Sequence, residues 1–146
     1  MIRGGGSLDR ALDVAHVNRV QNLVRTKILF VEDEEDCRHL VFDLLVREGA
    51  IVGLAHDAAE AIALFTQFRP HVVVSDVGLP GDDGYALVRL LRAVDLRIPA
   101  IALTGRVTGT DIARTLDAGF DAYVAKPVER GKLVGAICRL LAEGGA

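Results

Sequence analysis

Acidic side chains follow two of the apolar runs in this chain. Glu32 and Asp33 come directly after the run KILFV, and Asp76 follows the run HVVVS. Carboxylate oxygens are hard ligands of the kind that Mg²⁺ prefers, and in proteins this ion often takes one or two carboxylates together with phosphate oxygens. A carboxylate can also act as a nucleophile toward a phosphoryl group. These residues could therefore perform metal-assisted phosphoryl chemistry if the fold brought them together.

Two more polar residues end apolar runs farther along the chain. Thr104 follows the run AIAL, and Lys126 follows DAYVA. Two unit charges about 4 Å apart interact by roughly 4 kcal/mol at an intermediate effective dielectric constant, so a cluster of carboxylates needs a cation. Lys126 supplies one positive charge, and Pro127 beside it indicates a fixed turn. Thr104 alone could be an ordinary strand-end hydroxyl, and a functional role for it is indicated only because the other residues occur with it.

Strand and helix patterns alternate after residue 26. The predicted strands are residues 27–31, 50–54, 71–75, 99–103 and 121–125, and the predicted helices are residues 34–48, 57–69, 84–94, 108–118 and 129–142. The strand runs are short and β-branched, which is typical of strands covered on both faces. Asp57 and Glu60 form a capping box, Pro70 ends that helix, and Gly49 and Gly119 end two others.

Five such units predict an α/β fold. Parallel neighbouring strands need right-handed crossovers, so we expect a doubly wound three-layer sandwich. The carboxyl ends of the strands in such a sheet share one edge, along which the binding crevice lies. The acidic pair, Asp76, Thr104 and Lys126 should therefore meet at this edge although they are far apart in the sequence.

Composition excludes several classes of protein. The chain has 146 residues, of which 51% are hydrophobic and 25% charged, as expected for one ordinary domain. No apolar stretch is long enough to span a bilayer and no signal-peptide pattern begins the chain, so we expect a cytoplasmic protein without a membrane partner. The net charge is −3 and aromatics are few, which argues against direct nucleic-acid binding. Cys37 and Cys138 have no metal-site spacing, and we expect free thiols.

The chain divides into three parts on sequence alone. Residues 1–26 are expected to form a loosely docked, partly helical extension or linker, with a helix predicted from Leu8 to Val24. Residues 27–142 form the folded domain, and residues 143–146 form a tail. Because no further domain pattern follows, we expect the output to be a partner protein, a domain outside this sequence, or phosphate passed onward.

The segments around these residues resemble the receiver domains of two-component response regulators. The matching residues are Glu32-Asp33, the segment from Ser75 to Gly84, Leu103-Thr104, and the segment from Tyr123 to Pro127. The resemblance implies a flavodoxin-like (βα)5 sandwich with strand order 2-1-3-4-5. The segments GLPGDDGYAL and AKPV are similar in sequence to the corresponding segments of receivers carried by hybrid histidine kinases.

The resemblance also implies how the site works. Asp76 would be the phosphoacceptor, and Asp33, Asp76 and the backbone carbonyl of Gly78 would bind Mg²⁺. Glu32, which stands where aspartate is commoner, would hold a metal-bound water, and Lys126 would pair with the phosphoryl group.

Further residues have implied roles in switching and tuning. Thr104 would bond a phosphoryl oxygen after transfer, Tyr123 would be the switch aromatic, and the peptide bond between Lys126 and Pro127 would be cis. Gly78 and Arg106 occupy positions that tune phosphoryl stability in the family, and Gly105 stands where alanine is usual. We interpret Gly78 and Gly105 as leaving the site open, and Arg106 as a charge over its mouth.

The function implied is a non-enzymatic phosphoacceptor in a phosphorelay. The phosphoryl group would come from a histidine kinase or phosphotransfer protein, and a downstream partner would bind the face formed by the helix at 108–118, the strand at 121–125 and the helix at 129–142. The protein would be a monomer or weak homodimer. The alternative is a C-terminal receiver fragment of a hybrid sensor kinase that acts as a relay or phosphate sink.

Three rivals fit the residues less well. An aspartyl-phosphate phosphohydrolase of the haloacid-dehalogenase type needs a second aspartate two residues after the nucleophile, where this chain has Gly78. A flavodoxin-like mononucleotide binder needs a phosphate-binding loop after the first strand, where this chain has EDEED. A receiver-like domain that never takes phosphate is disfavoured because Glu32, Asp33, Asp76, Thr104 and Lys126 are all present.

Overall fold

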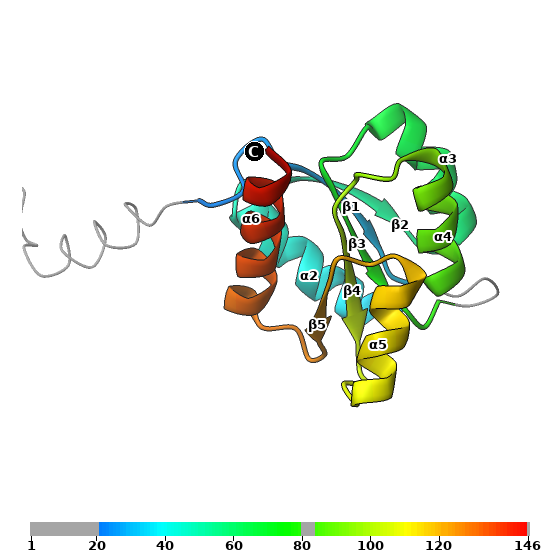
Figure 1. Ribbon diagram of the computed structural model, residues 1–146. Coiled ribbons are helices and arrows are strands. Elements are labelled where there is room, and N and C mark those ends of the chain that lie inside the picture. The colour runs from blue at the N-terminus through cyan, green and yellow to red at the C-terminus, as the bar shows by residue number, and fades with distance from the viewer. Residues whose placement is uncertain (1–20, 80–83, 146) are drawn as a thin grey trace, which may run out of the picture.

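The computed structural model describes residues 21–79 and 84–145. A parallel sheet lies between two layers of helices (Figure 1), and its strand order is β2-β1-β3-β4-β5, which confirms the predicted fold. The strands are β1 (Lys27–Val31), β2 (Ile51–Ala55), β3 (Val72–Asp76), β4 (Ala100–Thr104) and β5 (Ala122–Ala125). The helices are α2 (Glu35–Arg47), α3 (Ala58–Phe68), α4 (Gly84–Val94), α5 (Gly109–Ala118) and α6 (Arg130–Gly145).

Three strands lie one residue later than the sequence pattern predicted. β2, β3 and β4 continue to their last residues because these still pair with a neighbour: Asp76 is opposite Leu103, and Thr104 is opposite Ala125. Asp76 and Thr104 are therefore the final residues of their strands. This fixes their backbones at the carboxyl edge of the sheet.

The last helix is longer than predicted. α6 continues to Gly145, so residues 143–145, which were expected to form a tail, are helical. Ala142 and Glu143 are good helix formers and no proline interrupts them, so the helix continues where the sequence pattern of buried residues has already ended.

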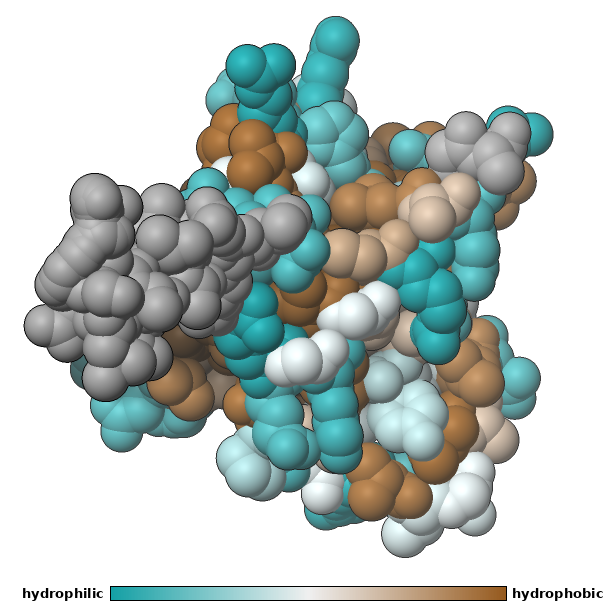
Figure 2. All heavy atoms as spheres, turned by 90° about the vertical axis from the view of Figure 1, so that its left-hand side faces the viewer, coloured by the Kyte–Doolittle hydropathy of each residue, from teal (hydrophilic) through white to brown (hydrophobic). Residues whose placement is uncertain are grey.

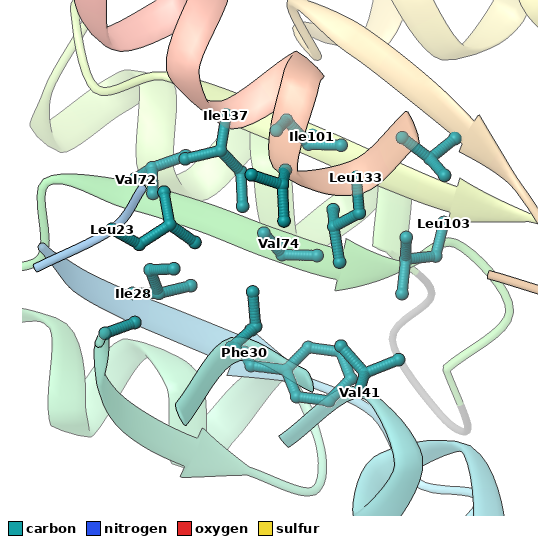
Figure 3. Close-up of a cluster of buried hydrophobic side chains, with 14 of the residues drawn as sticks. Leu23, Ile28, Phe30, Val41, Val72, Val74, Ile101, Leu103, Leu133 and Ile137 are labelled. Carbon is teal, nitrogen blue, oxygen red and sulfur yellow. The ribbon is translucent and has the colours of Figure 1, made fainter. Parts of the chain in front are cut away.

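Side chains of the strands alternate between two cores because successive residues point to opposite faces of a sheet. Ile28 and Phe30 of β1 pack under α2 and α6, whereas Leu29 and Val31 pack under α3, α4 and α5. Figure 3 shows the first of these cores, where side chains from β1, β3 and β4 meet Leu133 and Ile137 of α6. Burial on both faces explains why the strands read as continuous apolar runs.

One residue in the described part of the amino-terminal extension belongs to the core. Leu23 is fully buried in the core under α2 and α6 (Figure 3), and its backbone N–H donates to the carbonyl oxygen of Glu48 at 2.9 Å. Leu23 is therefore docked because its apolar side chain completes the core, whereas residues 21, 22, 24 and 25 are exposed. The residues before 21, with most of the helix predicted from Leu8, lie outside the described residues, and the domain boundary stays a prediction.

The surface on the side of α2 and α6 mixes hydrophilic side chains with small hydrophobic patches (Figure 2). Among the described residues, no helix has the length and apolar character needed to cross a membrane. Cys37 and Cys138 are both free and half-buried, as predicted.

Candidate functional site

Three carboxylates meet at the carboxyl edge of the sheet. Oxygen atoms of Glu32, Asp33 and Asp76 all lie within 4.8 Å of one another. Glu32 is fully buried, Asp76 is 9% exposed, and Asp33 is exposed to solvent. Because β1 and β3 are hydrogen-bonded neighbours, the topology alone brings these residues together. The three negative charges are close enough to repel one another strongly.

Lys126 lies between two of these carboxylates. Its Nζ is 2.9 Å from Oε1 of Glu32 and 3.3 Å from Oδ1 of Asp76. Burial works to lower the pKa of Lys126, but the hydrogen bond to Glu32 and the charge of Asp76 outweigh it, so the pKa is raised above 10.5. The peptide bond to Pro127 is cis, and the Lys126 N–H donates to the carbonyl oxygen of Thr104 at 2.8 Å.

The loop after β1 is held by the first turn of α2. Glu34 caps this helix, and its carboxylate accepts from the N–H groups of Asp36 and Cys37 at 3.0 and 2.9 Å. These bonds lower the pKa of Glu34. Nη1 of Arg38 donates to the carbonyl oxygens of Glu32 and Asp33 at 3.2 and 3.1 Å. The role of Arg38 was not predicted from the sequence. Its position one turn into the helix that follows the acidic pair was the feature that could have indicated it.

Glycines give the end of β3 its shape. A Cβ on Gly84 would lie 2.3 Å from the carbonyl oxygen of Asp76 and 2.6 Å from Cα of Val77, so only glycine lets α4 begin this close to the strand. A Cβ on Gly78 would lie 3.7 and 3.8 Å from the carboxylate oxygens of Asp76. A side chain at residue 78 would therefore contact the acidic group directly.

Thr104 is buried at the end of β4 and bonded to its own loop. Its hydroxyl donates to the carbonyl oxygen of Arg106 and accepts from the Arg106 N–H, both at 3.0 Å. A Cβ on Gly105 would meet nothing within 4 Å, so the space beside this loop is open.

A cavity of about 330 Å³ adjoins Asp76 on the side of β4 and α5. Its lining comprises Asp76, Val77, Gly78, Tyr85, Thr104, Gly105, Arg106, Asp111 and Arg114. The Arg114 guanidinium stacks over the Tyr85 ring at 4.5 Å from its centroid. Sequence reasoning missed both Tyr85 and Arg114, because an aromatic after Gly84 and an arginine within a helix carry no motif.

Tyr123 lies apart from this cavity. It is on the edge strand β5 and is 38% exposed. Leu116 of α5 and Val107, just before α5, are also large hydrophobic residues with 45% and 49% exposure. The structure thus brings carboxylate oxygens of Glu32, Asp33 and Asp76 within 4.8 Å of one another, with Lys126 between Glu32 and Asp76. It places Thr104 on the adjoining cavity and Tyr123 at the surface.

Cys37 lies beside the buried Glu32. Burial is the main reason that the pKa of the Cys37 thiol rises from 9.0 to about 12, and a hydrogen bond to Glu32 and its charge add to the effect. This thiol stays protonated at neutral pH, unlike an activated cysteine nucleophile.

Comparisons with known proteins agree with this arrangement. The family model described as response regulator receiver domain matches residues 28–138. A 14.6 kDa protein of Leptolyngbya boryana, described as uncharacterised, is 38% identical over 79% of this chain and 89% of its own length. The transcriptional regulatory protein TrcR of Mycobacterium tuberculosis is 38% identical over 79% of this chain and 45% of its own length.

Solved structures show the same fold. The receiver domain of sensor histidine kinase PA1611 from Pseudomonas aeruginosa, which has a magnesium ion coordinated in its active site cleft, is 31% identical. It superposes with a TM-score of 0.76, covering 82% of this chain and 99% of that one. The chain spans about half the length of the transcriptional regulators it matches. From its sequence and its fold, this chain belongs to the response regulator receiver domains, the signalling modules of two-component phosphorelays.

Proposed function

We propose that this receiver domain accepts a phosphoryl group on Asp76 from a histidine kinase or a phosphotransfer protein. The observation that carries the proposal is the contact of Asp76 with Lys126 at 3.3 Å inside a cluster of three carboxylates. A carboxylate is a weak nucleophile, but phosphoryl transfer passes through a loose transition state, so position and charge neutralisation supply most of the rate.

The residues at this edge fit a bound Mg²⁺. Three carboxylates face one lysine, which leaves surplus negative charge on hard oxygen donors. Oε1 of Glu32 bonds Lys126 and Oε2 accepts from the Glu34 N–H at 3.2 Å, so Glu32 suits a water-mediated role. Asp33, Asp76 and the carbonyl oxygen of Gly78 would hold the ion. When bound, Mg²⁺ would neutralise the carboxylates and the incoming phosphoryl oxygens.

Each side chain then has a defined task. An oxygen of Asp76 bonds to phosphorus while the bond between phosphorus and the donor's histidine nitrogen breaks, and the electron pair of that bond leaves with the nitrogen. Lys126 exchanges its contact with Asp76 for an oxygen of the phosphoryl group. Phosphorylation adds about −1.5 to −2 charge units at the end of β3. Lys126, 3.3 Å from Asp76, and a bound Mg²⁺ would balance part of this charge.

The switch begins at Thr104. Its hydroxyl must break its bonds with Arg106 to reach a phosphoryl oxygen, which moves the loop between β4 and α5. The exposed Tyr123 then turns inward and changes the face formed by α5, β5 and α6, where we place the downstream partner. Gly78, Gly105 and Arg106 set how long the phosphoryl group persists. A cytoplasmic location and a monomeric or weakly dimeric state belong to the same proposal.

A second candidate is a receiver that forms part of a hybrid sensor kinase and relays or stores phosphate. It is favoured by the 31% identity to the receiver domain of sensor histidine kinase PA1611. Both candidates use Asp76 in the same chemistry and differ only in the partner.

Mass spectrometry tests the proposed function. Incubation of the chain with acetyl phosphate and Mg²⁺ should add one phosphoryl group, as measured by intact mass. Asp76→Asn should show no adduct, whereas Asp43→Asn on the exposed face of α2 should be phosphorylated normally. An unmodified wild type, or an adduct that persists in Asp76→Asn, would contradict the proposal.

A further inference from the structure

The cavity beside Asp76 is larger than phosphoryl transfer requires. Its volume of about 330 Å³ is roughly ten times the liquid-volume share of one water molecule, about 30 Å³. A phosphoryl group at Asp76 would fill only its inner end. The remaining space extends between α4 and α5 to Tyr85 and Arg114, so it can hold the group that leaves when phosphorus is transferred.

Arg114 is an exposed residue of α5 that lines this cavity and contacts Tyr85. Its guanidinium stacks on Tyr85, and the Tyr85 hydroxyl lies 3.4 Å from Oγ1 of Thr115, a buried residue of α5. Within residues 21–79 and 84–145, Arg114 forms no ion pair. The nearby Asp111 accepts a hydrogen bond from the Thr108 hydroxyl at 2.5 Å. A guanidinium stacked on a ring and without a carboxylate partner is suited to binding an anion.

We propose that Arg114 and Tyr85 form a leaving-group site that favours small acyl phosphates as phosphodonors. This inference rests on the proposed role of Asp76. The carboxylate released from an acyl phosphate is planar and anionic, and a guanidinium presents two parallel N–H donors to such a group. Tyr85 keeps the guanidinium facing the cavity. Arg114 is thereby a specificity-determining residue for the donor.

The transfer balances without another reactant. An Asp76 oxygen bonds to phosphorus, and the bond between phosphorus and the acyl oxygen breaks. Its electron pair leaves with the acyl oxygen, so acetyl phosphate yields acetate and an aspartyl phosphate. The leaving oxygen gains negative charge in the transition state, which is where a preorganised cation accelerates a reaction.

Phosphoramidate provides the contrasting donor. Its nitrogen is protonated, so cleavage of the bond between phosphorus and nitrogen releases neutral ammonia. No negative charge develops on that leaving group, and Arg114 has nothing to stabilise. The two donors therefore separate a leaving-group role from a general effect on Asp76.

The experiment compares phosphorylation rates of wild type and Arg114→Ala with both donors at equal Mg²⁺, followed by intact mass. Arg114→Ala should lower the rate with acetyl phosphate about tenfold and change the rate with phosphoramidate less than twofold. Arg114→Lys, which keeps the charge but not the planar fork, should fall between wild type and Arg114→Ala. Arg139→Ala on α6 removes the same charge far from the cavity and should leave both rates unchanged.

The outcomes are distinct. Equal loss with both donors, equal rates in wild type and Arg114→Ala, or the same donor dependence in Arg139→Ala would overturn the leaving-group site. A wild type that neither donor phosphorylates would instead overturn the proposed function of Asp76. Circular dichroism of each variant checks that the fold is retained.

Discussion

Two buried glutamates of this domain face a basic side chain, but their surroundings differ in charge balance. Glu48, at the end of α2, is 2% exposed, and its Oε2 accepts from Nε of Arg130 at 2.6 Å. Its Oε1 accepts from the backbone N–H of Asn22 at 3.2 Å. Glu32, at the end of β1, also bonds a base, Lys126, but two further carboxylates lie within 4.8 Å.

The difference separates a structural ion pair from a reactive site. The Glu48 carboxylate accepts from both Arg130 and the Asn22 N–H, and so ties the amino-terminal segment to α2 and α6. Among the described residues, the cluster at the carboxyl edge has three carboxylates, two of which contact Lys126, so a bound cation would reduce their mutual repulsion. Substitutions in the two regions should therefore have separate effects on stability and on phosphorylation.

The largest effect on stability is expected at Glu48. Glu48→Gln should lower the free energy of unfolding by about 2 kcal/mol, because charge-assisted hydrogen bonds to a buried group are lost. Phosphorylation of Asp76 should be unchanged. Urea denaturation measures the first and intact mass the second. The control Glu143→Gln alters an exposed pair with Arg139 and should have almost no effect.

Lys126→Gln should have a smaller effect that depends on metal. Without Mg²⁺ it should lower the free energy of unfolding by about 1 kcal/mol, because Glu32 and Asp76 lose their shared cation. Added Mg²⁺ should recover most of this loss. A loss that Mg²⁺ does not alter would contradict the surplus-charge interpretation.

The loss of stability in Lys126→Gln should also depend on pH. The pKa of Lys126 is raised above 10.5 in the folded state, so its stabilising contribution is complete below 10.5 and is lost as the pH rises through the folded pKa. The stability difference between wild type and Lys126→Gln should therefore shrink above pH 10.5, as measured by urea denaturation at several pH values.

Asp33→Asn should act in the opposite direction on stability. Removal of one repelling carboxylate should raise the midpoint of urea denaturation slightly without Mg²⁺ and lower Mg²⁺ affinity about tenfold. Calorimetric titration measures the affinity. Asp36→Asn removes a nearby acid of α2 outside the 4.8 Å cluster and should keep the wild-type affinity.

The smallest effect on stability is expected at Cys37, which lies beside Glu32 at the acidic edge. Burial, aided by Glu32, holds its pKa at about 12, so little thiolate exists at pH 9 in the folded state. In a Cys138→Ser background, alkylation of Cys37 by iodoacetamide at pH 9 should be at least tenfold slower in native buffer than in urea. Because the folded pKa exceeds 9.0, ionisation of this thiol also costs stability as the pH rises toward 12.

The fold and the acidic edge could be predicted because both follow from short-range patterns. Apolar runs such as KILFV define buried strands, and parallel order then brings Glu32 and Asp76 to one edge whatever their separation in sequence. Strand ends were misplaced by one residue at Asp76 because a polar residue can still pair in the sheet.

The remaining contacts could not be predicted because they depend on how helices are rotated and where side chains reach. Glu48 meets Arg130 across 82 residues, and nothing local marks either as a partner. The stacking of Arg114 on Tyr85 depends on the packing of α5 against α4. Leu23 lies in a segment that the sequence pattern predicts to be a linker. It is a core residue because its side chain fills space under α2 and α6, which the sequence pattern does not show.

The most direct test of the central claim locates the phosphoryl group. After incubation with acetyl phosphate, borohydride reduction converts an aspartyl phosphate to homoserine, which peptide mass spectrometry assigns to one position. The account predicts homoserine at residue 76 in the presence of Mg²⁺ and almost none with a chelator. Homoserine at residue 33 or elsewhere, or equal labelling of Asp76 with and without Mg²⁺, would contradict it.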